Sequence, residues 1–237
     1  VLKDLEQKAF EKDSRVVKVG HCAYNETKVE TQIINSKGLD LARSYAYQSV
    51  VLNAIAEEGE SLGDAYGFKA AFNLSDINLD ELAKECVEEA TANLGAGFIE
   101  TGKYEVVFNR DVATSLLQVF CNNFSAEAAI KKSTILADKV NQKVFGDNIT
   151  ITDDPFYQKG LIKYAFDDEG VPCHKKNIVE NGVFKGFLHN LETASKFGVE
   201  PTGNGFKRGV ASNVKVSPTN LYLAPGEGTK DDVIAHC

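Results

Sequence analysis

Two histidines offer the first prospect of metal chemistry in this 237-residue sequence. His174 and His189 lie on either side of Asn181-Gly182, a pair that favours a two-residue hairpin loop. If the hairpin register continues far enough, the two imidazoles face each other and can share one metal ion. The alternative is that the strands diverge first and both imidazoles are solvated. We favour the alternative, because a register far from its turn is poorly defined by sequence.

Ser61 offers a second chemistry, because residues 59–63 read Gly-Glu-Ser-Leu-Gly and fit G-x-S-x-G. In serine hydrolases this motif is a turn between a strand and a helix, and it exposes the nucleophilic hydroxyl. Residues 66–72 alternate like a strand, so no helix is expected after Ser61. A hairpin turn is therefore the preferred interpretation, and a serine hydrolase using Ser61 remains an alternative.

Two other kinds of segment could bind ions. Residues 203–209 are rich in glycine and basic, and their backbone N–H groups could hold an anion. They lack both the G-x-G-x-x-G spacing and a following helix, so we interpret them as a flexible loop or a tight turn. The acidic segments 153–154 and 167–170 do not fit the EF-hand spacing. Asp beside Pro or Gly is more typical of a turn, which is our interpretation of both.

The elements that would position these residues fall into two groups. In the first group, alternating apolar residues predict antiparallel strands, and a stripe at helical spacing predicts a helix that covers them. The predicted elements are a helix over 2–12, a strand around 29–33, a second strand that follows a turn at 35–38 and ends at 56, and a third strand over 66–72. A helix over 79–94, capped by Asn78 or Ser75, completes the group.

The second group mixes helices and strands. Its predicted elements are a strand over 104–108, a helix over 111–124, a helical or mixed segment over 126–144, a strand over 149–152, a hairpin over 178–184, a helix over 191–197 and a strand over 219–223. We therefore expect an α+β fold, with an antiparallel β-meander and covering helix followed by a mixed α/β unit. Gly95-Ala96-Gly97 predicts the boundary, which divides the chain into domains 1–97 and 98–237.

Composition limits the classes of partner. The net charge is −8, which argues against a nucleic-acid partner held by a basic face. No apolar run approaches the length of about 18 residues that a membrane helix needs. The 5 cysteines are scattered, and they form neither a disulfide framework nor a zinc ribbon, so we expect a cytoplasmic location. Methionine is absent, position 1 included, so we expect a fragment of a longer chain.

Taken in order along the chain, five segments resemble the TldD/PmbA family, whose members are described as modulators of DNA gyrase and as peptide-processing metalloproteases. The segments are Ile149–Pro155, Phe166–Pro172, Ile178–Gly186, Thr202–Gly205 and Thr219–Gly226. The resemblance implies that the whole protein is longer at both ends. It also implies that residues 98–237 begin an incomplete C-terminal domain of this family.

The resemblance further places the chain in one branch of the family. The TldD branch carries a zinc motif, H-E-x-x-x-H, in a helix before the Asp-Asp segment. Here Gln118 and Asn123 stand where the motif has its histidines, and Val119 stands where it has its glutamate. Zinc needs nitrogen, sulfur or oxygen ligands and a general base needs a carboxylate, and valine supplies neither. The chain therefore resembles the PmbA branch, in which we expect no catalytic residue, no metal and no cofactor in the chain itself.

The expected function follows from this resemblance. We expect a non-catalytic, PmbA-like subunit of a cytoplasmic metalloprotease system that acts on peptides or unfolded proteins. The expected partners are a TldD-like homologous subunit, which would carry any zinc, a second copy of the chain, or both. The resemblance also implies that Thr202, Gly203 and Asn204 lie near the substrate. A peptide-binding module without a protease partner remains an alternative, and neither nucleic acid nor membrane is expected as a partner.

Overall fold

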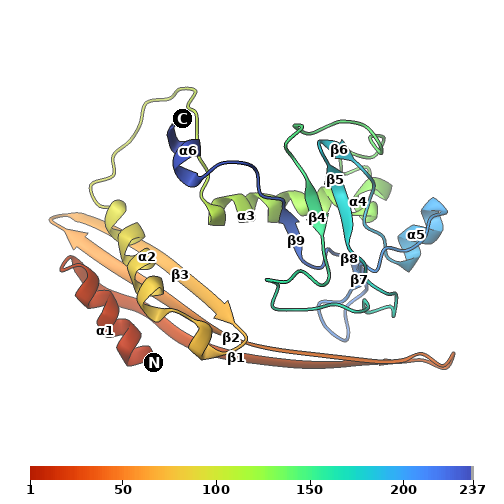
Figure 1. Cartoon of the computed structure of the whole chain (residues 1–237), viewed down its shortest axis with the longest axis horizontal. Coiled ribbons are helices and arrows are strands. Elements are labelled where there is room, and N and C mark those ends of the chain that lie inside the picture. Colours follow the sequence, from red (N-terminus) through yellow and green to blue (C-terminus); the bar gives the residue numbers. More distant parts are fainter. Residues whose placement is uncertain (236–237) are drawn as a thin grey trace. The chain divides into compact units, whose positions relative to one another are not determined.

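The computed structural model describes residues 1–235, which form two compact units (Figure 1). The first unit contains residues 1–30 and 44–102, and the second contains residues 31–43 together with the chain from residue 103 onward. Each unit has its own cluster of buried apolar side chains. Residues 31–43 pack with the second unit although they precede the expected boundary at residue 97. The two units are therefore not simply two consecutive stretches of the sequence.

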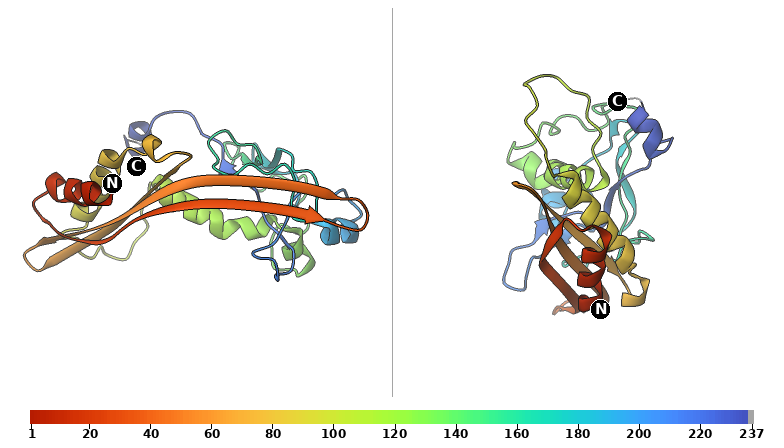
Figure 2. Two further views of the ribbon diagram at one scale, coloured as in Figure 1. Left: turned by 90° about the horizontal axis from the view of Figure 1, so that it is seen from below. Right: turned by 90° about the vertical axis from the view of Figure 1, so that its left-hand side faces the viewer.

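The first unit is built on a three-stranded sheet in the order β1-β2-β3, as the meander prediction requires. Its strands are β1 (Val16–Ile34), β2 (Asp40–Glu58) and β3 (Ser61–Ala71), and β1 and β2 appear as the long ribbons of Figure 2. Strands β2 and β3 pair in antiparallel fashion around a tight turn, with Glu58 opposite Ser61. The predicted β-meander is therefore confirmed.

Two α-helices and one short 3-10 helix complete this unit. Helix α1 (Leu2–Lys12) packs against helix α2 (Leu79–Ala92), and η1 (Leu74–Asp76) precedes α2. The Asn78 side chain accepts a hydrogen bond from the Glu81 N–H at 3.1 Å, so Asn78, and not Ser75, caps α2. The buried stripe of α2 includes Cys86, whose thiol lies 3.3 Å from the carbonyl oxygen of Ala65 in β3.

Helix α2 can approach β3 closely because small residues line the facing side of the strand. A Cβ atom added to Gly63 would lie 2.1 Å from the carbonyl oxygen of Ala90, and one added to Gly67 would lie 2.6 Å from Leu82 Cδ1. The aromatic residues of β3 point the other way, and Tyr66 is 66% exposed. The strand therefore packs through its glycines, which permit close contact between helix and sheet.

The second unit contains short elements. Its helices are α3 (Arg110–Phe120), η2 (Cys121–Phe124), α4 (Ala126–Ile130), α5 (Leu191–Phe197) and α6 (Lys230–Ala235). Its strands are β4 (Ile151–Asp153), β5 (Lys176–Glu180), β6 (Val183–Phe184), β7 (Gly205–Phe206), β8 (Lys215–Val216) and β9 (Leu221–Leu223). A four-stranded sheet runs in the order β6-β5-β4-β9, and β7 pairs with β8. The α+β class is confirmed.

Local signals in this unit were predicted correctly. The Asn181-Gly182 turn has positive φ at both residues, 47° and 80°, as a type I′ hairpin requires. Helix α5 has the predicted bounds and ends at Gly198, whose φ of 66° is the left-handed conformation typical of a glycine cap. In both cases the sequence signal lies in adjacent residues.

One prediction for this unit was wrong. Residues 104–108 form no strand in the structure, and their apolar side chains are exposed, with Val106 at 61%. An alternating segment becomes a strand only when another strand supplies hydrogen-bond partners, and none pairs with it in the described part of the chain. The segment 126–144 is mixed, as expected: it is helical as far as Ile130 and irregular afterwards.

The helix α3 is amphipathic but has no buried residue. Its apolar side chains remain accessible, and Val119 is 73% exposed. Within residues 1–235, no helix combines the length and the apolar character needed to cross a membrane.

Arg43 holds the hairpin tip within the second unit. Its guanidinium donates hydrogen bonds to the Phe166 carbonyl oxygen at 2.6 Å and to Asp168 Oδ1 at 2.5 Å. The same group lies 5.4–5.8 Å from the ring centroids of Tyr164, Phe166 and Phe206. The side chains of Arg43 and Asp168 are only 12% and 13% exposed, so solvent screens this pair less than a surface ion pair.

The glycine contact between β3 and α2 gives the first prediction. Gly63→Ala should lower the free energy of unfolding by about 2 kcal/mol, because the new methyl group clashes with the α2 backbone. Gly97→Ala is the matched control, since a Cβ there would meet nothing within 4 Å. Urea denaturation of both variants measures the difference. Equal stability of the two variants would contradict the packing described for β3.

Candidate functional site

The acidic turn at residues 167–170 organises the neighbouring backbone. Asp167 is fully buried, and its Oδ1 accepts hydrogen bonds from the N–H groups of Glu169 and Val171, both at 3.0 Å. Its Oδ2 accepts a hydrogen bond from the Gly205 N–H at 2.8 Å. Burial raises the pKa of the Asp167 carboxyl, and the three N–H donors oppose that rise. Because the donors on Glu169 and Val171 lie within four residues of Asp167, the prediction of a turn is confirmed.

The next two residues of the turn hold the glycine-rich segment in place. Asp168 Oδ2 accepts a hydrogen bond from the Lys207 N–H at 2.8 Å. A Cβ atom on Gly205 would lie 2.3 Å from Glu169 Oε2, so a larger residue there would displace the Glu169 carboxylate. Gly205 and the following residue form β7, which pairs with β8. The segment was expected to be a flexible loop or a tight turn. Residues 205–206 instead form a short strand, because carboxylates distant in sequence supply the order that the local sequence lacks, and the chain bends and turns at residues 208–212.

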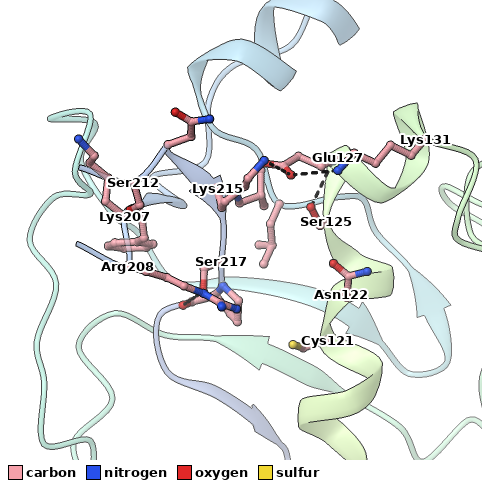
Figure 3. A pocket seen from close by; sticks show the side chains of 15 residues that line it. Cys121, Asn122, Ser125, Glu127, Lys131, Lys207, Arg208, Ser212, Lys215 and Ser217 are labelled. Atoms are coloured by element: carbon pink, nitrogen blue, oxygen red, sulfur yellow. Dashed lines mark hydrogen bonds and ion pairs between the residues drawn. The ribbon is translucent and has the colours of Figure 1, made fainter. Parts of the chain in front are cut away.

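A cavity of about 730 Å³ opens beside this segment and is the candidate functional site. Its wall comes from the η2–α4 region on one side and from the chain between β7 and β8 on the other (Figure 3). Apolar residues such as Leu188 and polar residues such as Ser125 both line the cavity. The charged residues in the lining are Glu127, Lys131, Lys207, Arg208 and Lys215.

Asn204 lies under this region and is completely buried. Its Nδ2 donates to Asp153 Oδ2 and to the Ser217 carbonyl oxygen, both at 2.9 Å. Its Oδ1 accepts hydrogen bonds from Thr202 Oγ1 at 2.7 Å and from Lys176 Nζ at 3.1 Å. The amide group is therefore fully used within the fold. A direct contact of Asn204 with substrate stays a prediction, and the geometry favours a supporting role.

Gly203 is also buried and touches a cysteine. The thiol of Cys173 lies 3.0 Å from the Gly203 carbonyl oxygen and donates a hydrogen bond to it. Burial raises the pKa of the Cys173 thiol to about 12, so the thiol is protonated at neutral pH. Thr202 Oγ1 accepts a hydrogen bond from the His189 N–H at 2.7 Å, which joins this segment to the chain before α5. The role of Thr202 and Gly203 near a substrate stays a prediction.

The facing arrangement of His174 and His189 is not formed. The hairpin keeps the predicted register only as far as Lys185, three pairs from its turn. Beyond it the chain turns away, and Leu188 pairs with Ser125 instead of continuing along β5. The residues that break the register are far apart in sequence, so the turn alone could not predict the divergence.

The two histidines lie in different surroundings. His174 is exposed, whereas His189 is 6% exposed and packs its ring against Phe197 at a centroid distance of 5.3 Å. The Nδ1 atom of His189 has no hydrogen-bond partner among the described residues, and burial lowers the pKa of its imidazole. No group of three or more His, Cys, Asp or Glu side chains in residues 1–235 is arranged to hold a metal ion.

Ser61 and the residues at the positions of the zinc motif are not part of the cavity lining. Ser61 begins β3 directly after a hairpin turn, and its Oγ accepts a hydrogen bond from the Gly95 N–H at 2.8 Å. The strand–turn–helix context of a serine nucleophile is absent there. Gln118 and Val119 are exposed on α3, and the Asn123 side chain in η2 donates to a backbone carbonyl at 3.2 Å.

Sequence reasoning missed two of the cavity's four basic residues. Lys131 and Lys215 are separated by more than eighty positions, and no motif links them. Lys207 and Arg208 belong to the glycine-rich segment that was noted as a possible anion site through its backbone. The available signal was a local excess of basic residues in an acidic chain, and the structure adds the lysines that face them.

The buried histidine predicts a pH effect on stability. Because the pKa of His189 is lowered in the folded state, the unfolded chain takes up a proton below about pH 6.5 that the folded chain resists. Stability is therefore lost as pH falls through that value, by up to about 1 kcal/mol at pH 5.5. Urea denaturation at pH 7.5 and 5.5 should show a smaller loss in His189→Gln, with His21→Gln as the comparison. An unchanged loss in His189→Gln would contradict this assignment.

Comparison with known proteins places both units in one family. Residues 1–94 match the model of the PmbA/TldA metallopeptidase central domain, and residues 101–237 match that of the PmbA/TldA metallopeptidase C-terminal domain. A crystal structure from Thermotoga maritima, of a candidate modulator of a DNA gyrase, is 36% identical with a TM-score of 0.89, and the match covers 99% of this chain and 54% of that one.

Curated relatives give the same result. A metalloprotease of Methanothermobacter thermautotrophicus is 28% identical over 90% of this chain and 47% of its own length. The metalloprotease PmbA of Escherichia coli O157:H7 is 26% identical over 84% of this chain and 44% of its own length. The chain thus spans about half the length of the curated relatives that it matches. On these grounds the chain belongs to the PmbA/TldD metallopeptidase family.

Proposed function

We propose that this chain is a PmbA-like subunit of a cytoplasmic metalloprotease system that acts on peptides or unfolded proteins, and that it contributes no catalytic residue. The observation that carries the proposal is the set of residues at the positions of the family's zinc motif: Gln118, Val119 and Asn123. A metallopeptidase site needs zinc ligands and a carboxylate that activates water. Val119 can do neither, and in this proposal a second subunit supplies this chemistry.

The exposed apolar side chains of α3 support association with another protein surface. Val112, Val119 and Phe120 are 43%, 73% and 57% exposed. Large exposed apolar surfaces mark sites of interaction more often than free surface. A TldD-like homologous subunit, or a second copy of this chain, would cover such a helix.

In this proposal the substrate lies on the second unit. Thr202, Gly203 and Asn204 support the wall of the substrate cleft, a role that the burial of Gly203 and Asn204 favours over direct contact. The edge of a sheet can also hold an extended peptide by adding it as a strand. The chain thereby guides substrate toward zinc held by its partner.

The cysteines support a reducing compartment. Four of them, Cys22, Cys86, Cys121 and Cys173, are free thiols in the structure. Secreted proteins with several cysteines generally pair them, whereas cytoplasmic proteins keep them reduced. The net charge of −8 supports peptide rather than nucleic acid as the substrate. The names of some relatives mention DNA gyrase, but the charge of this chain does not favour binding to DNA.

Reconstitution with a partner tests the proposal. The chain is co-expressed with a homologue that carries H-E-x-x-x-H, and hydrolysis of an unfolded protein is followed. We expect the two proteins to purify together and to hydrolyse the substrate only in combination. Gln118→Ala in this chain should leave the rate within about twofold, whereas Glu→Gln in the partner's motif should abolish it.

Metal analysis of each protein alone provides the control. We expect zinc in the partner, whose motif supplies the ligands, and none bound stoichiometrically by this chain. One tightly bound zinc per purified chain, or peptide hydrolysis by this chain without a partner, would overturn the non-catalytic role.

A further inference from the structure

The cavity beside α4 concentrates positive charge in a chain whose net charge is −8. Lys131, Lys207, Arg208 and Lys215 line it, and Glu127 is the one carboxylate among the described lining residues. Three more positive than negative charges therefore meet in one concave site. Like charges repel, so such a group is held together at a cost unless an anion compensates it.

Glu127 cannot neutralise this charge. Its Oε1 accepts a hydrogen bond from the Val216 N–H at 3.0 Å, which fixes the carboxylate against β8. Its Oε2 lies 3.5 Å from Lys215 Nζ and 3.9 Å from Lys131 Nζ. One negative charge is thus shared by two lysines, and Figure 3 shows the Glu127 side chain reaching from α4 toward Lys215.

The opposite wall carries cations with no carboxylate partner. Lys207 Nζ donates to the Val210 carbonyl oxygen at 2.8 Å, and a neutral carbonyl leaves its charge in place. Arg208 is exposed and forms no ion pair within the described chain. The backbone beneath them is fixed by the bond from the Lys207 N–H to Asp168. The two cations are therefore presented on an ordered segment.

The remaining lining indicates the size and kind of ligand. Asn122, Ser212 and Ser217 place amide and hydroxyl groups among the cations, and Leu188 and Val216 add apolar surface. A volume of about 730 Å³ lies within the range of sites for small ligands and exceeds what one carboxylate needs. A segment of chain with several side chains matches this mixture better than a single ion.

We propose that this basic cavity binds an acidic segment of a peptide, with Arg208 and Lys215 pairing with its Asp or Glu carboxylates. The inference rests on the proposed function, since it names the class of peptide that the subunit guides. A short acidic segment meets only the cavity, whereas the long polyanionic backbone of a nucleic acid would also meet the negative charge of the rest of the chain.

Fluorescence anisotropy of the purified chain with a labelled peptide of ten residues tests the proposal. The probe alternates Glu and Ser, and the matched probe has Gln in place of Glu. We expect the Glu peptide to bind more tightly, and its Kd to rise between about 50 mM and about 300 mM salt, as screening of ion pairs requires. Arg208→Gln with Lys215→Gln should raise the Kd about tenfold.

Lys3→Gln with Lys18→Gln is the matched control, because it removes the same charge from exposed residues of the first unit. We expect less than about a twofold change in Kd for this control. Thermal unfolding of both double variants verifies that each is folded.

Three results would overturn the proposal. They are equal affinity for the Glu and Gln peptides, an equal loss of affinity in the two double variants, and tighter binding of a single-stranded decanucleotide that also depends on Arg208 and Lys215. The last result would assign the cavity to nucleic acid. No partner protein is present in this assay, so its outcome is independent of the reconstitution test. A failed reconstitution with a positive binding result would remove only the proposed function.

Discussion

Two adjacent carboxylates, Asp167 and Asp168, determine the path of the chain that carries the basic wall of the cavity. A buried carboxylate loses its hydration, and three backbone N–H donors offset that loss at Asp167. Asp168 binds the Lys207 N–H and the Arg43 guanidinium together. The glycine-rich segment has little order of its own, so its conformation depends on negative charge placed beneath it.

The first unit reaches order by steric rather than electrostatic means. Gly63 and Gly67 let α2 lie directly on β3, and larger side chains would separate the two elements. The second unit has small sheets and short helices, and it uses polar contacts through its centre, as the buried side chains of Asp153 and Asn204 show. Hydrophobic packing stabilises the first unit. The second unit has both a hydrophobic cluster and a buried hydrogen-bond network.

These differences explain what the sequence could predict. The Asn181-Gly182 turn, the Asn78 cap and the bounds of α5 depend on adjacent residues, and sequence patterns predicted all three. Features that depend on distant pairing were missed, because a pattern does not name its partner. Arg43 contacts a carbonyl 123 positions away. The basic cavity likewise brings Lys131 together with Lys215, which lies far from it in the sequence. The strand expected at residues 104–108 failed for the same reason, since its pattern was present and its partner was not.

The burial of Cys173 against Gly203 has a consequence for the reactivity of its thiol. A thiol with a pKa of about 12 is deprotonated in fewer than about one molecule in ten thousand at neutral pH. Peroxides and alkylating agents attack the thiolate, so this cysteine is inert toward them while the chain stays folded. It can therefore lie against the backbone next to Asn204 without making the candidate substrate region sensitive to oxidative stress. A thiol in this position reports unfolding, since only the opened chain would react.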